Sequence, residues 1–320
     1  MVNLVGRPVP DVRWGLTVPF TGIPLSRHAD LFRAAEAAGY DDLWTGETAG
    51  ADGFTPLALA AAVTDRVRLG TGIVNPFTRG PSVLAQHAAA LADASQGRFV
   101  LGLGSSSNVI VERWNDVPFV KPLSKVREAV QNLRPVLAGE RGTGGFKLEV
   151  KPEYEIPIVL AALRGKMLGL AAEVADGAFT NWLPVSGARQ VADAFGAPDK
   201  ELVCRFFCIP QPAEEAMSLA KWMFAAYGTV PVYTEFFRWL GWGEAIDPVA
   251  EAWHGGDRAG ALELVSEELI REIFLFGEEA AMGERLAEFA EGGVTTFVLT
   301  PITTPDHLPR MIDALATARP

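Results

Sequence analysis

The segment from residue 65 to residue 108 constrains the fold more than any other part of this chain. It runs from a strand-like stretch, Arg66–Val74, through a helix-like stretch, Pro81–Ala94, into a second strand-like stretch, Arg98–Gly104. A strand, a helix and a second strand at this length indicate a parallel βαβ unit. Both strands end in polar turns, Asn75–Arg79 and Ser105–Asn108. Because ligands of α/β proteins bind at the carboxyl ends of parallel strands, the two turns predict one shared site.

The same alternation of strand and helix extends along almost the whole chain. The further predicted strands are Val12–Val18, Asp42–Thr45, Ile156–Ala161, Gly177–Asn181, Leu202–Ile209 and Val294–Leu299. The further predicted helices are Leu25–Ala38, Phe54–Val63, Leu123–Leu137, Met167–Ala175, Gly187–Phe195, Glu214–Ala225 and Asp306–Ala318. Strands that are each followed by a helix, with right-handed crossovers, predict an α/β fold of the (β/α)8 TIM barrel type. A doubly wound sheet is the alternative, but it favours an early glycine-rich dinucleotide fingerprint that this sequence lacks.

Two segments exceed a minimal barrel. Residues 105–120 are predicted to form a long loop after the fourth strand, and residues 227–282 a mostly helical insertion before the eighth. We expect both segments to shape the substrate pocket. The sequence has neither an internal repeat nor a low-complexity segment, so residues 1–320 are expected to form a single domain.

The composition is typical of a globular protein and argues against several classes of partner. Hydrophobic residues make up 49% of the chain and the formal net charge is −11, which disfavours nucleic acid as a partner. No apolar run reaches the length of a membrane span, and residues 1–10 lack the apolar core of a signal peptide. We therefore expect a cytoplasmic protein that acts on a small molecule, with neither a nucleic-acid nor a membrane partner.

The cysteines and histidines predict neither a disulfide nor a metal site. Cys204 and Cys208 lie four residues apart on a predicted strand, about 13 Å from each other, which is too far for a disulfide. The four histidines are scattered without the spacing of metal ligands. No Gly-x-Ser-x-Gly elbow or catalytic triad spacing is present either. The strand ends are short of titratable groups, which favours an enzyme whose cofactor carries the chemistry.

Polar or glycine-containing residues follow most of the predicted strands, and a barrel brings the strand ends together at one mouth. They are Glu47, Gly72–Arg79, Ser105–Asn108, Arg164–Lys166, Asn181–Trp182 and Thr300–Thr304. Gly72 inside a strand indicates either a kink for barrel closure or a bulge whose backbone supports a planar ring. Arg164-Gly165-Lys166 opens a predicted helix, so its backbone N–H groups and two cations indicate an anion site. Ser105–Ser107 either caps a helix or hydrogen-bonds another polar group of the ligand.

The sequence resembles the bacterial luciferase-like superfamily, and most of all its branch that uses the deazaflavin coenzyme F-420. The segments that carry the resemblance are Leu43–Glu47, Leu69–Arg79, Gly97–Asn108, Glu112–Asn115, Ala171–Gly177 and Arg285–Val294. The match is specific to the superfamily, less specific to the cofactor, and silent about the substrate.

The resemblance implies a barrel with a late insertion and a seat for coenzyme F-420 (8-hydroxy-5-deazaflavin). Gly72-Ile73 matches the place where deazaflavin relatives carry a bulge with a non-prolyl cis peptide behind the ring. Ala161–Lys166 matches the loop that holds the phosphate, although Leu163-Arg164 replaces two small residues of the family's pattern. Ser105–Asn108 matches the lining of the ring and the ribityl chain. The expected cofactor contacts are Gly72, Ile73, Asn75, Gly104, Ser105, Ser106, Asn108, Ala161, Ala162, Leu163, Arg164, Gly165, Lys166, Asn181 and Trp182.

The resemblance also implies a homodimer. The predicted helices Phe54–Val63 and Pro81–Ala94 are rich in alanine and leucine on more than one face. Surplus apolar surface on an outer helix of a barrel indicates a partner. We therefore expect a two-fold dimer built on these two helices.

One departure from the family's pattern bears on the reaction. Sugar-phosphate dehydrogenases of the family use a histidine after the second strand and a glutamate after the fourth, where this chain has Thr48 and Ser107. The acid–base pair for alcohol oxidation is therefore missing. We interpret the chain as an F-420-dependent oxidoreductase that transfers hydride between reduced deazaflavin and a polarised C=C, C=N or C=O bond of a small organic substrate. Glu47 and Ser107 are the candidate catalytic residues, for proton delivery or for hydrogen bonding to the substrate.

Two other functions stay open on sequence alone. The first is an FMN-dependent luciferase-like monooxygenase that takes reduced flavin from a separate reductase. The second is a cofactor-binding protein without turnover. Deazaflavin reacts poorly with oxygen, so the oxygen reactivity of the reduced cofactor separates the first alternative from the hydride transferase.

Overall fold

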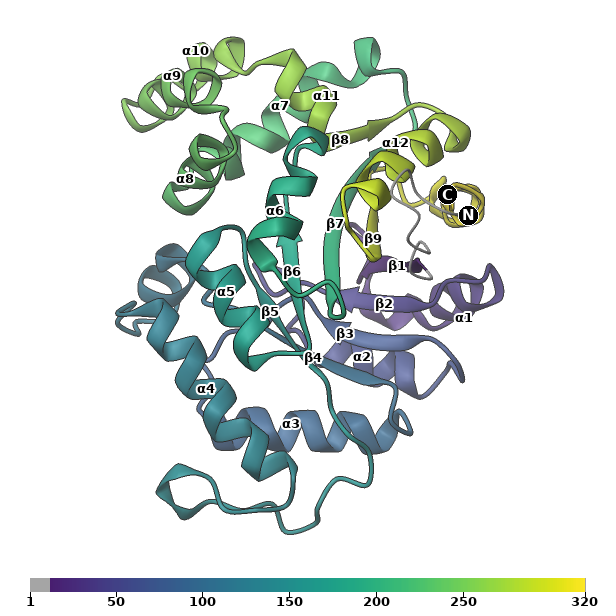
Figure 1. Ribbon diagram of the computed structural model, residues 1–320. Helices are drawn as coiled ribbons and strands as arrows, with labels where there is room; N and C mark the ends of the chain where they lie inside the picture. Colours follow the sequence, from purple (N-terminus) through teal and green to yellow (C-terminus); the bar gives the residue numbers. More distant parts are fainter. Residues whose placement is uncertain (1–11, 320) are drawn as a thin grey trace.

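A closed barrel of parallel strands forms the centre of the protein (Figure 1). The computed structural model describes residues 12–319. The barrel strands are β1 (Arg13–Val18), β2 (Asp42–Thr45), β3 (Arg68–Thr71), β4 (Phe99–Leu103), β5 (Ile158–Ala161), β6 (Gly177–Asn181), β7 (Glu201–Ile209) and β9 (Thr296–Pro301). Each pairs with the next in this order, and β9 closes the ring by pairing with β1. The prediction of a (β/α)8 TIM barrel is confirmed.

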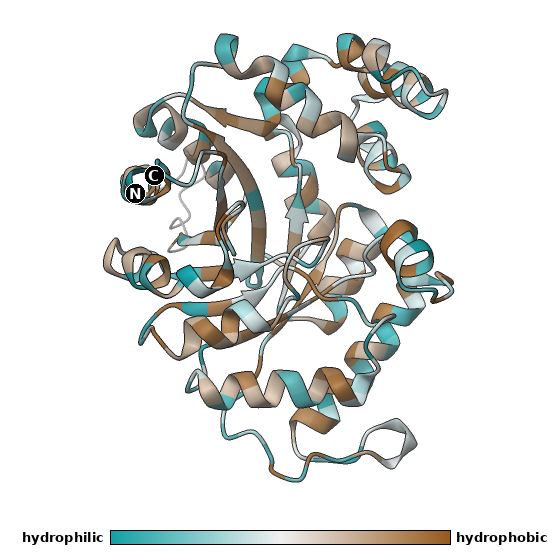
Figure 2. Ribbon diagram, turned by 180° about the vertical axis from the view of Figure 1, so that it is seen from behind, coloured by the Kyte–Doolittle hydropathy of each residue, from teal (hydrophilic) through white to brown (hydrophobic). Residues whose placement is uncertain are grey.

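α-Helices cover the outside of the barrel. They are α1 (Ala29–Ala37), α2 (Thr55–Ala61), α3 (Pro81–Ala94), α4 (Pro122–Leu137), α5 (Gly165–Val174), α6 (Ala188–Phe195), α12 (Glu279–Glu291) and α13 (Leu308–Thr317). Helix α3 shows why they pack inward, because its buried residues Leu84, Ala88 and Leu91 recur at helical spacing on one face. Figure 2 shows hydrophobic residues along the strands that these helices cover. No helix among residues 12–319 combines the length and apolarity needed to cross a bilayer.

A group of further helices follows β7 and lies together at one end of the molecule (Figure 1). They are α7 (Ala213–Gly228), α8 (Pro231–Trp239), α9 (Gly243–His254), α10 (Arg258–Leu264) and α11 (Glu267–Ile273). Short 3-10 turns occur at Leu25–Arg27, Thr143–Gly145 and Val185–Gly187, and a π-helix at Val109–Trp114 lies inside the loop after β4.

The sequence analysis missed two elements, a short strand and a barrel helix. The strand β8 (Phe274–Phe276) pairs only with the carboxyl end of β7 and stays outside the ring. Helix α12 leads into β9, so it takes the position of the seventh barrel helix. The helix predicted at Glu214–Ala225 exists as α7, but it packs against α8, α9, α10 and α11. An amphipathic pattern predicts that a segment is a helix, but it does not predict what the helix packs against. The pattern therefore did not show that α12, and not α7, covers the barrel.

A cluster of large side chains fills the barrel interior. Its members are Trp44, Val100, Val159, Phe179, Val203 and Val298. Trp44 fits because Gly70, its paired residue on β3, and Gly15 on β1 both lie against the indole without a side chain. A Cβ on Gly70 would lie 2.3 Å from Cε3 of the indole. The Trp44 indole meets the Phe179 ring edge-on, with ring centroids 5.4 Å apart.

Below this cluster, at the amino ends of the strands, buried charges join several strands. The Asp42 carboxylate is inaccessible to solvent and accepts hydrogen bonds from Arg13 at 2.5 Å and Arg68 at 2.7 Å. Arg68 also pairs with Glu201 at 2.5 Å, and the Thr296 hydroxyl donates to Glu201. Burial alone would raise the pKa of Asp42, but Arg68 and Arg13 hold that pKa below its ordinary value. The carboxylate therefore stabilises the fold above the ordinary aspartate pKa, and this stabilisation is lost as the pH falls through the depressed value.

We expect Asp42→Asn to lower the free energy of unfolding by about 3–5 kcal/mol, because it leaves the largely buried guanidinium of Arg68 beside a neutral amide. Asp30→Asn is the matched control, since Asp30 pairs with Arg33 on the exposed face of α1 and contributes little. Urea unfolding followed by tryptophan fluorescence measures both variants. Equal stability of the two would contradict a structural role for the buried charges.

Candidate functional site

The inward-facing residues at the carboxyl ends of the strands form the mouth of the barrel. Successive side chains of a strand alternate between its two faces. Residues two positions beyond the interior cluster therefore also face inward. On β4 to β7 and β9 these are Gly102, Ala161, Asn181, Arg205 and Thr300. The mouth is thus lined by small residues on β4 and β5 and by polar side chains on β6, β7 and β9.

The third strand does not run straight to its end. β3 stops at Thr71, the peptide bond Gly72–Ile73 is cis, and pairing with β4 resumes at Val74. The prediction of a bulge with a cis peptide at this place is confirmed. The Thr71 hydroxyl donates to the carbonyl of Gly102 at 2.9 Å and accepts from its N–H at 2.8 Å. The hydroxyl thus replaces the missing backbone partner of the Gly102 N–H, and the Gly102 carbonyl also accepts from the N–H of Val74 at 3.0 Å, so both backbone groups of Gly102 stay satisfied.

The ends of β3, β4 and β5 pack closely because Gly72 and Gly104 lack side chains. A Cβ on Gly104 would lie 2.6 Å from Cβ of Ala161 and 2.8 Å from Cγ1 of Ile73. A Cβ on Gly72 would lie 2.8 Å from the Phe179 ring. This part of the mouth, which we call the bare floor, therefore consists of backbone and very small side chains at Gly72, Gly104 and Ala161, with Ile73 packed against Gly104.

Arg205 on β7 is the main residue of the mouth that the sequence analysis missed. Its Nη2 donates to the carbonyl of Gly72 at 2.5 Å, and its guanidinium lies 5.5 Å from the centroid of the Phe179 ring. Burial lowers the pKa of Arg205, and the nearby Tyr233 and Tyr227 act in the opposite direction. An arginine at an inward position of the otherwise apolar stretch Leu202–Ile209 was the signal that could have identified it.

Asn181 and Trp182 at the end of β6 connect the mouth to the helices after β7. The Asn181 side-chain N–H donates to the Tyr233 hydroxyl on α8 at 3.2 Å. Trp182 is 2% exposed and adopts a left-handed backbone conformation with φ of 54°. Its indole stacks on Tyr227 and packs on Phe207 at 4.1 Å between centroids. Asn181 therefore borders the mouth, whereas Trp182 lies in an aromatic cluster behind it.

The candidate catalytic residues Glu47 and Ser107 are both held by local hydrogen bonds. Glu47 accepts two bonds of 2.6 Å from the Arg79 guanidinium and a third from the backbone N–H of Gly53. The Ser107 hydroxyl accepts from the N–H of Ile110 at 3.3 Å and so caps the π-helix. Asn75 is likewise engaged, because its side-chain oxygen accepts from the N–H groups of Phe77 and Thr78.

The remaining predicted contacts lie in the loops after β4 and β5. Ser105 and Ser106 are partly buried, and Asn108 is exposed. Ser106 has a positive φ of 60°. Arg164 precedes α5, so Gly165 and Lys166 are the first residues of that helix, and Arg164 pairs with Glu235 on α8 at 3.2 Å. The backbone N–H groups at the start of α5 and the exposed Lys166 make this a suitable place for an anion.

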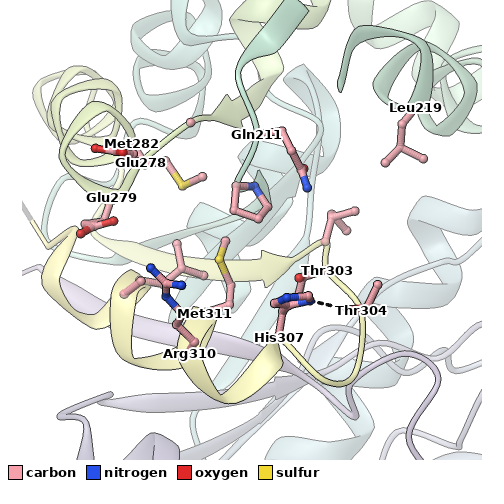
Figure 3. A pocket seen from close by; sticks show the side chains of 15 residues that line it. Gln211, Leu219, Glu278, Glu279, Met282, Thr303, Thr304, His307, Arg310 and Met311 are labelled. Atoms are coloured by element: carbon pink, nitrogen blue, oxygen red, sulfur yellow. Dashed lines mark hydrogen bonds between the residues drawn. The ribbon is translucent and has the colours of Figure 1, made fainter. Parts of the chain in front are cut away.

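A separate groove of about 790 Å³ lies beyond the ends of β7 and β9, between α12 and α13 (Figure 3). Thr304 and His307 are hydrogen-bonded there at 2.8 Å. None of the predicted cofactor or catalytic residues lines this groove. Within residues 12–319, no group of three or more His, Cys, Asp or Glu side chains is arranged to hold a metal ion.

Known proteins share both sequence and fold with this chain. The luciferase-like monooxygenase family matches residues 12–296. A Mycobacterium tuberculosis protein named as a coenzyme F-420-dependent oxidoreductase is 31% identical, over 90% of this chain and 95% of its own length. A 5,10-methylenetetrahydromethanopterin reductase of Methanolobus tindarius is 30% identical, over 86% of this chain and 90% of its own length. The structure of the coenzyme F-420-dependent tetrahydromethanopterin reductase of Methanopyrus kandleri superposes with a TM-score of 0.78 at 23% identity, covering 97% of this chain and 98% of that one.

Proposed function

The chain belongs to the luciferase-like monooxygenase family, and we propose that it is an F-420-dependent oxidoreductase within it. Bound reduced deazaflavin would supply a hydride from C5 to a polarised C=C, C=N or C=O bond, while a proton from solvent completes the reduction and the coenzyme is left oxidised. The similarity to a relative named as an F-420-dependent oxidoreductase supports this proposal.

The observation that carries the proposal is the bare floor at Gly72, Gly104 and Ala161. No side chain projects from Gly72 or Gly104, and the Phe179 ring and the Ile73 side chain pack directly against the backbone there. A planar ring can lie flat on such a surface, and the protein then contributes orientation more than acid–base chemistry. The floor closes one face of the ring, so the substrate approaches from the other face.

The other predicted contacts would hold the coenzyme's tail. Ser105, Ser106 and Asn108 lie directly after β4 and offer polar groups to the ribityl chain. Ala161 leads through Ala162 and Leu163 into Arg164-Gly165-Lys166 at the start of α5, where N–H groups and cations suit a phosphate. We propose that Asn75, Asn181 and Trp182 complete the surroundings of the ring from β3 and β6, with Ile73 packed behind it.

Glu47 and Ser107 are proposed to contact the substrate at the mouth. Arg79 holds Glu47 by two short hydrogen bonds, and this geometry favours a role for the carboxylate in accepting hydrogen bonds over one in proton delivery. Ser107 retains its hydroxyl proton as a donor, because its oxygen acts as the acceptor in the cap. Residues 105–120 and 227–282 are proposed to shape the substrate pocket from opposite sides of the mouth.

Binding titrations with F-420 and FMN test the proposed function. We expect tight binding of F-420, weaker binding of FMN, and no oxygen uptake by the complex of the enzyme with reduced F-420. Calorimetry and an oxygen electrode provide the measurements. Preferential binding of FMN with oxygen uptake would instead identify a monooxygenase, and tight binding of F-420 without oxidation by any acceptor would identify a binding protein.

We expect the double substitution Arg164→Ala and Lys166→Ala to weaken F-420 binding by about 1.5 kcal/mol or more for each lost charge-assisted hydrogen bond. The control is the pair Arg33→Ala and Arg285→Ala, since the exposed Arg33 and the half-buried Arg285 each pair with a carboxylate on their own helix. The affinity for riboflavin-like fragments without a phosphate should stay unchanged in both. Unaltered affinity for the intact coenzyme would remove these residues from the phosphate site.

We also propose that the protein forms a two-fold dimer on α2 and α3. The outer faces of these helices expose small apolar side chains, Ala58 on α2 and Val83, Ala90 and Ala94 on α3. Replacing Ala90 with Glu should dissociate the dimer without unfolding the barrel, because the side chain lies on the outer face. Light scattering at micromolar concentration measures this, and a monomeric unsubstituted protein would refute the proposal.

A further inference from the structure

Four buried side-chain atoms without a hydrogen-bond partner lie close together in sequence and in the sheet. Within residues 12–319 these atoms are Thr180 Oγ1, Asn181 Oδ1, Trp182 Nε1 and Arg205 Nε. Asn181 ends β6 and is in register with Arg205 in the middle of β7, and both side chains face the mouth, whereas Thr180 and Trp182 face the other side of the sheet. Buried polar groups are almost always hydrogen-bonded in native proteins. The unpaired atoms of Asn181 and Arg205 at the mouth therefore indicate a site where a ligand supplies the missing partners.

Arg205 carries the charge of this site. In the described part of the chain its guanidinium forms no ion pair, and its only hydrogen bond is the one to the carbonyl of Gly72. Burying a cation without a counter-ion is strongly unfavourable. The neighbours that influence its pKa are the neutral groups Tyr233, Tyr227 and Cys204, and none of them compensates the charge. A negatively charged ligand would compensate it.

Tyr233 on α8 supplies a second donor next to the arginine. Its hydroxyl oxygen accepts from Asn181 at 3.2 Å, so its own proton remains free to donate. Burial raises the pKa of Tyr233 to about 12. The phenol therefore stays protonated at neutral pH and acts as a donor to an anion. Tyr227 lies beside it, with ring centroids 6.3 Å apart, and stacks on Trp182 instead.

We propose that Arg205 and Tyr233 bind a carboxylate group of the substrate, so that the substrate is an organic acid. This inference rests on the proposed hydride transfer and specifies its substrate class. One guanidinium and one neutral hydroxyl match the single charge of a carboxylate. Because Arg205 is bonded to the Gly72 carbonyl next to the bare floor, a carboxylate held here places the adjoining carbons over the proposed ring position.

Binding of matched acid and amide probes tests this inference. Cinnamate and its neutral amide, cinnamamide, have the same shape and an activated C=C bond, and phenyl phosphate serves as a dianionic probe. We expect the unsubstituted protein to bind cinnamate at least about tenfold more tightly than cinnamamide, the scale expected for a hydrogen bond between charged groups. Titration calorimetry with and without F-420 measures the preference.

Three variants identify the residues responsible. Arg205→Met should abolish the preference for the acid, Arg205→Lys should keep part of it, and Tyr233→Phe should weaken it several-fold. Tyr154→Phe is the matched control and should leave the preference unchanged, because Tyr154 packs against Gly97 before β4, at the other end of the barrel. Urea unfolding of each variant separates loss of the site from loss of the fold, and Arg205→Lys carries the test if Arg205→Met does not fold.

The outcomes keep the two proposals apart. A preference for cinnamate that disappears in Arg205→Met supports the carboxylate site, even when F-420 does not bind and the proposed function fails. Equal binding of cinnamate and cinnamamide by the unsubstituted protein overturns the inference, even when F-420 binds tightly. A stronger preference for phenyl phosphate than for cinnamate also overturns it, because the site would then be a phosphate site.

Discussion

The filling of a narrow barrel by a few large side chains is the constraint on which the rest of the structure depends. Trp44 occupies the interior only because Gly15 and Gly70 lack side chains. Below it lies the guanidinium of Arg68, 5.5 Å from the indole centroid, and above it Phe179 meets the indole edge-on. Arg205 lies in turn over Phe179. A continuous column of two aromatic rings with a cation at each end thus joins the charge cluster at one end of the barrel to the mouth at the other.

The column explains why the two ends of the barrel differ in chemistry. At the closed end, each of the cations Arg13 and Arg68 has a carboxylate partner, and the charges link β1, β2, β3 and β7. At the mouth the last cation, Arg205, has only a backbone carbonyl. The same residue type therefore stabilises the fold at one end and remains available to a ligand at the other.

Local patterns in the sequence were sufficient for the barrel and for the position of its mouth. The alternation of strands and helices predicted every barrel strand, because it follows from backbone properties of short segments. The glycine at position 72 indicated a kink or a bulge, and the family resemblance predicted the bulge. The bare floor was also accessible, since Gly72 and Gly104 mark it directly. The sequence did not show that α12, and not α7, packs on the barrel, because helical periodicity does not identify the partner of a helix.

Contacts between distant segments explain what the sequence did not show. Arg205 sits in an apolar strand, and nothing near it in the chain indicates that it meets the carbonyl of Gly72, 133 residues away. The sequence analysis placed Tyr233 in the insertion at residues 227–282 and gave it no role of its own. Its hydroxyl nevertheless accepts a hydrogen bond from Asn181 of the barrel. The pairing of Glu47 with Arg79 was equally hidden, because each residue alone is an ordinary charged residue in a loop.

The contact between Asn181 and Tyr233 has a consequence for how proteins of this architecture diversify. The bare floor comes from β3, β4 and β5, whereas the hydroxyl of Tyr233 comes from a helix of the excursion after β7. Sequence change in that excursion alters what faces the floor without disturbing the packing of the floor itself. Under the proposed function, part of substrate recognition is thus encoded in a segment separate from the strands beneath the ring, and selection can exchange that segment while inheriting the floor intact.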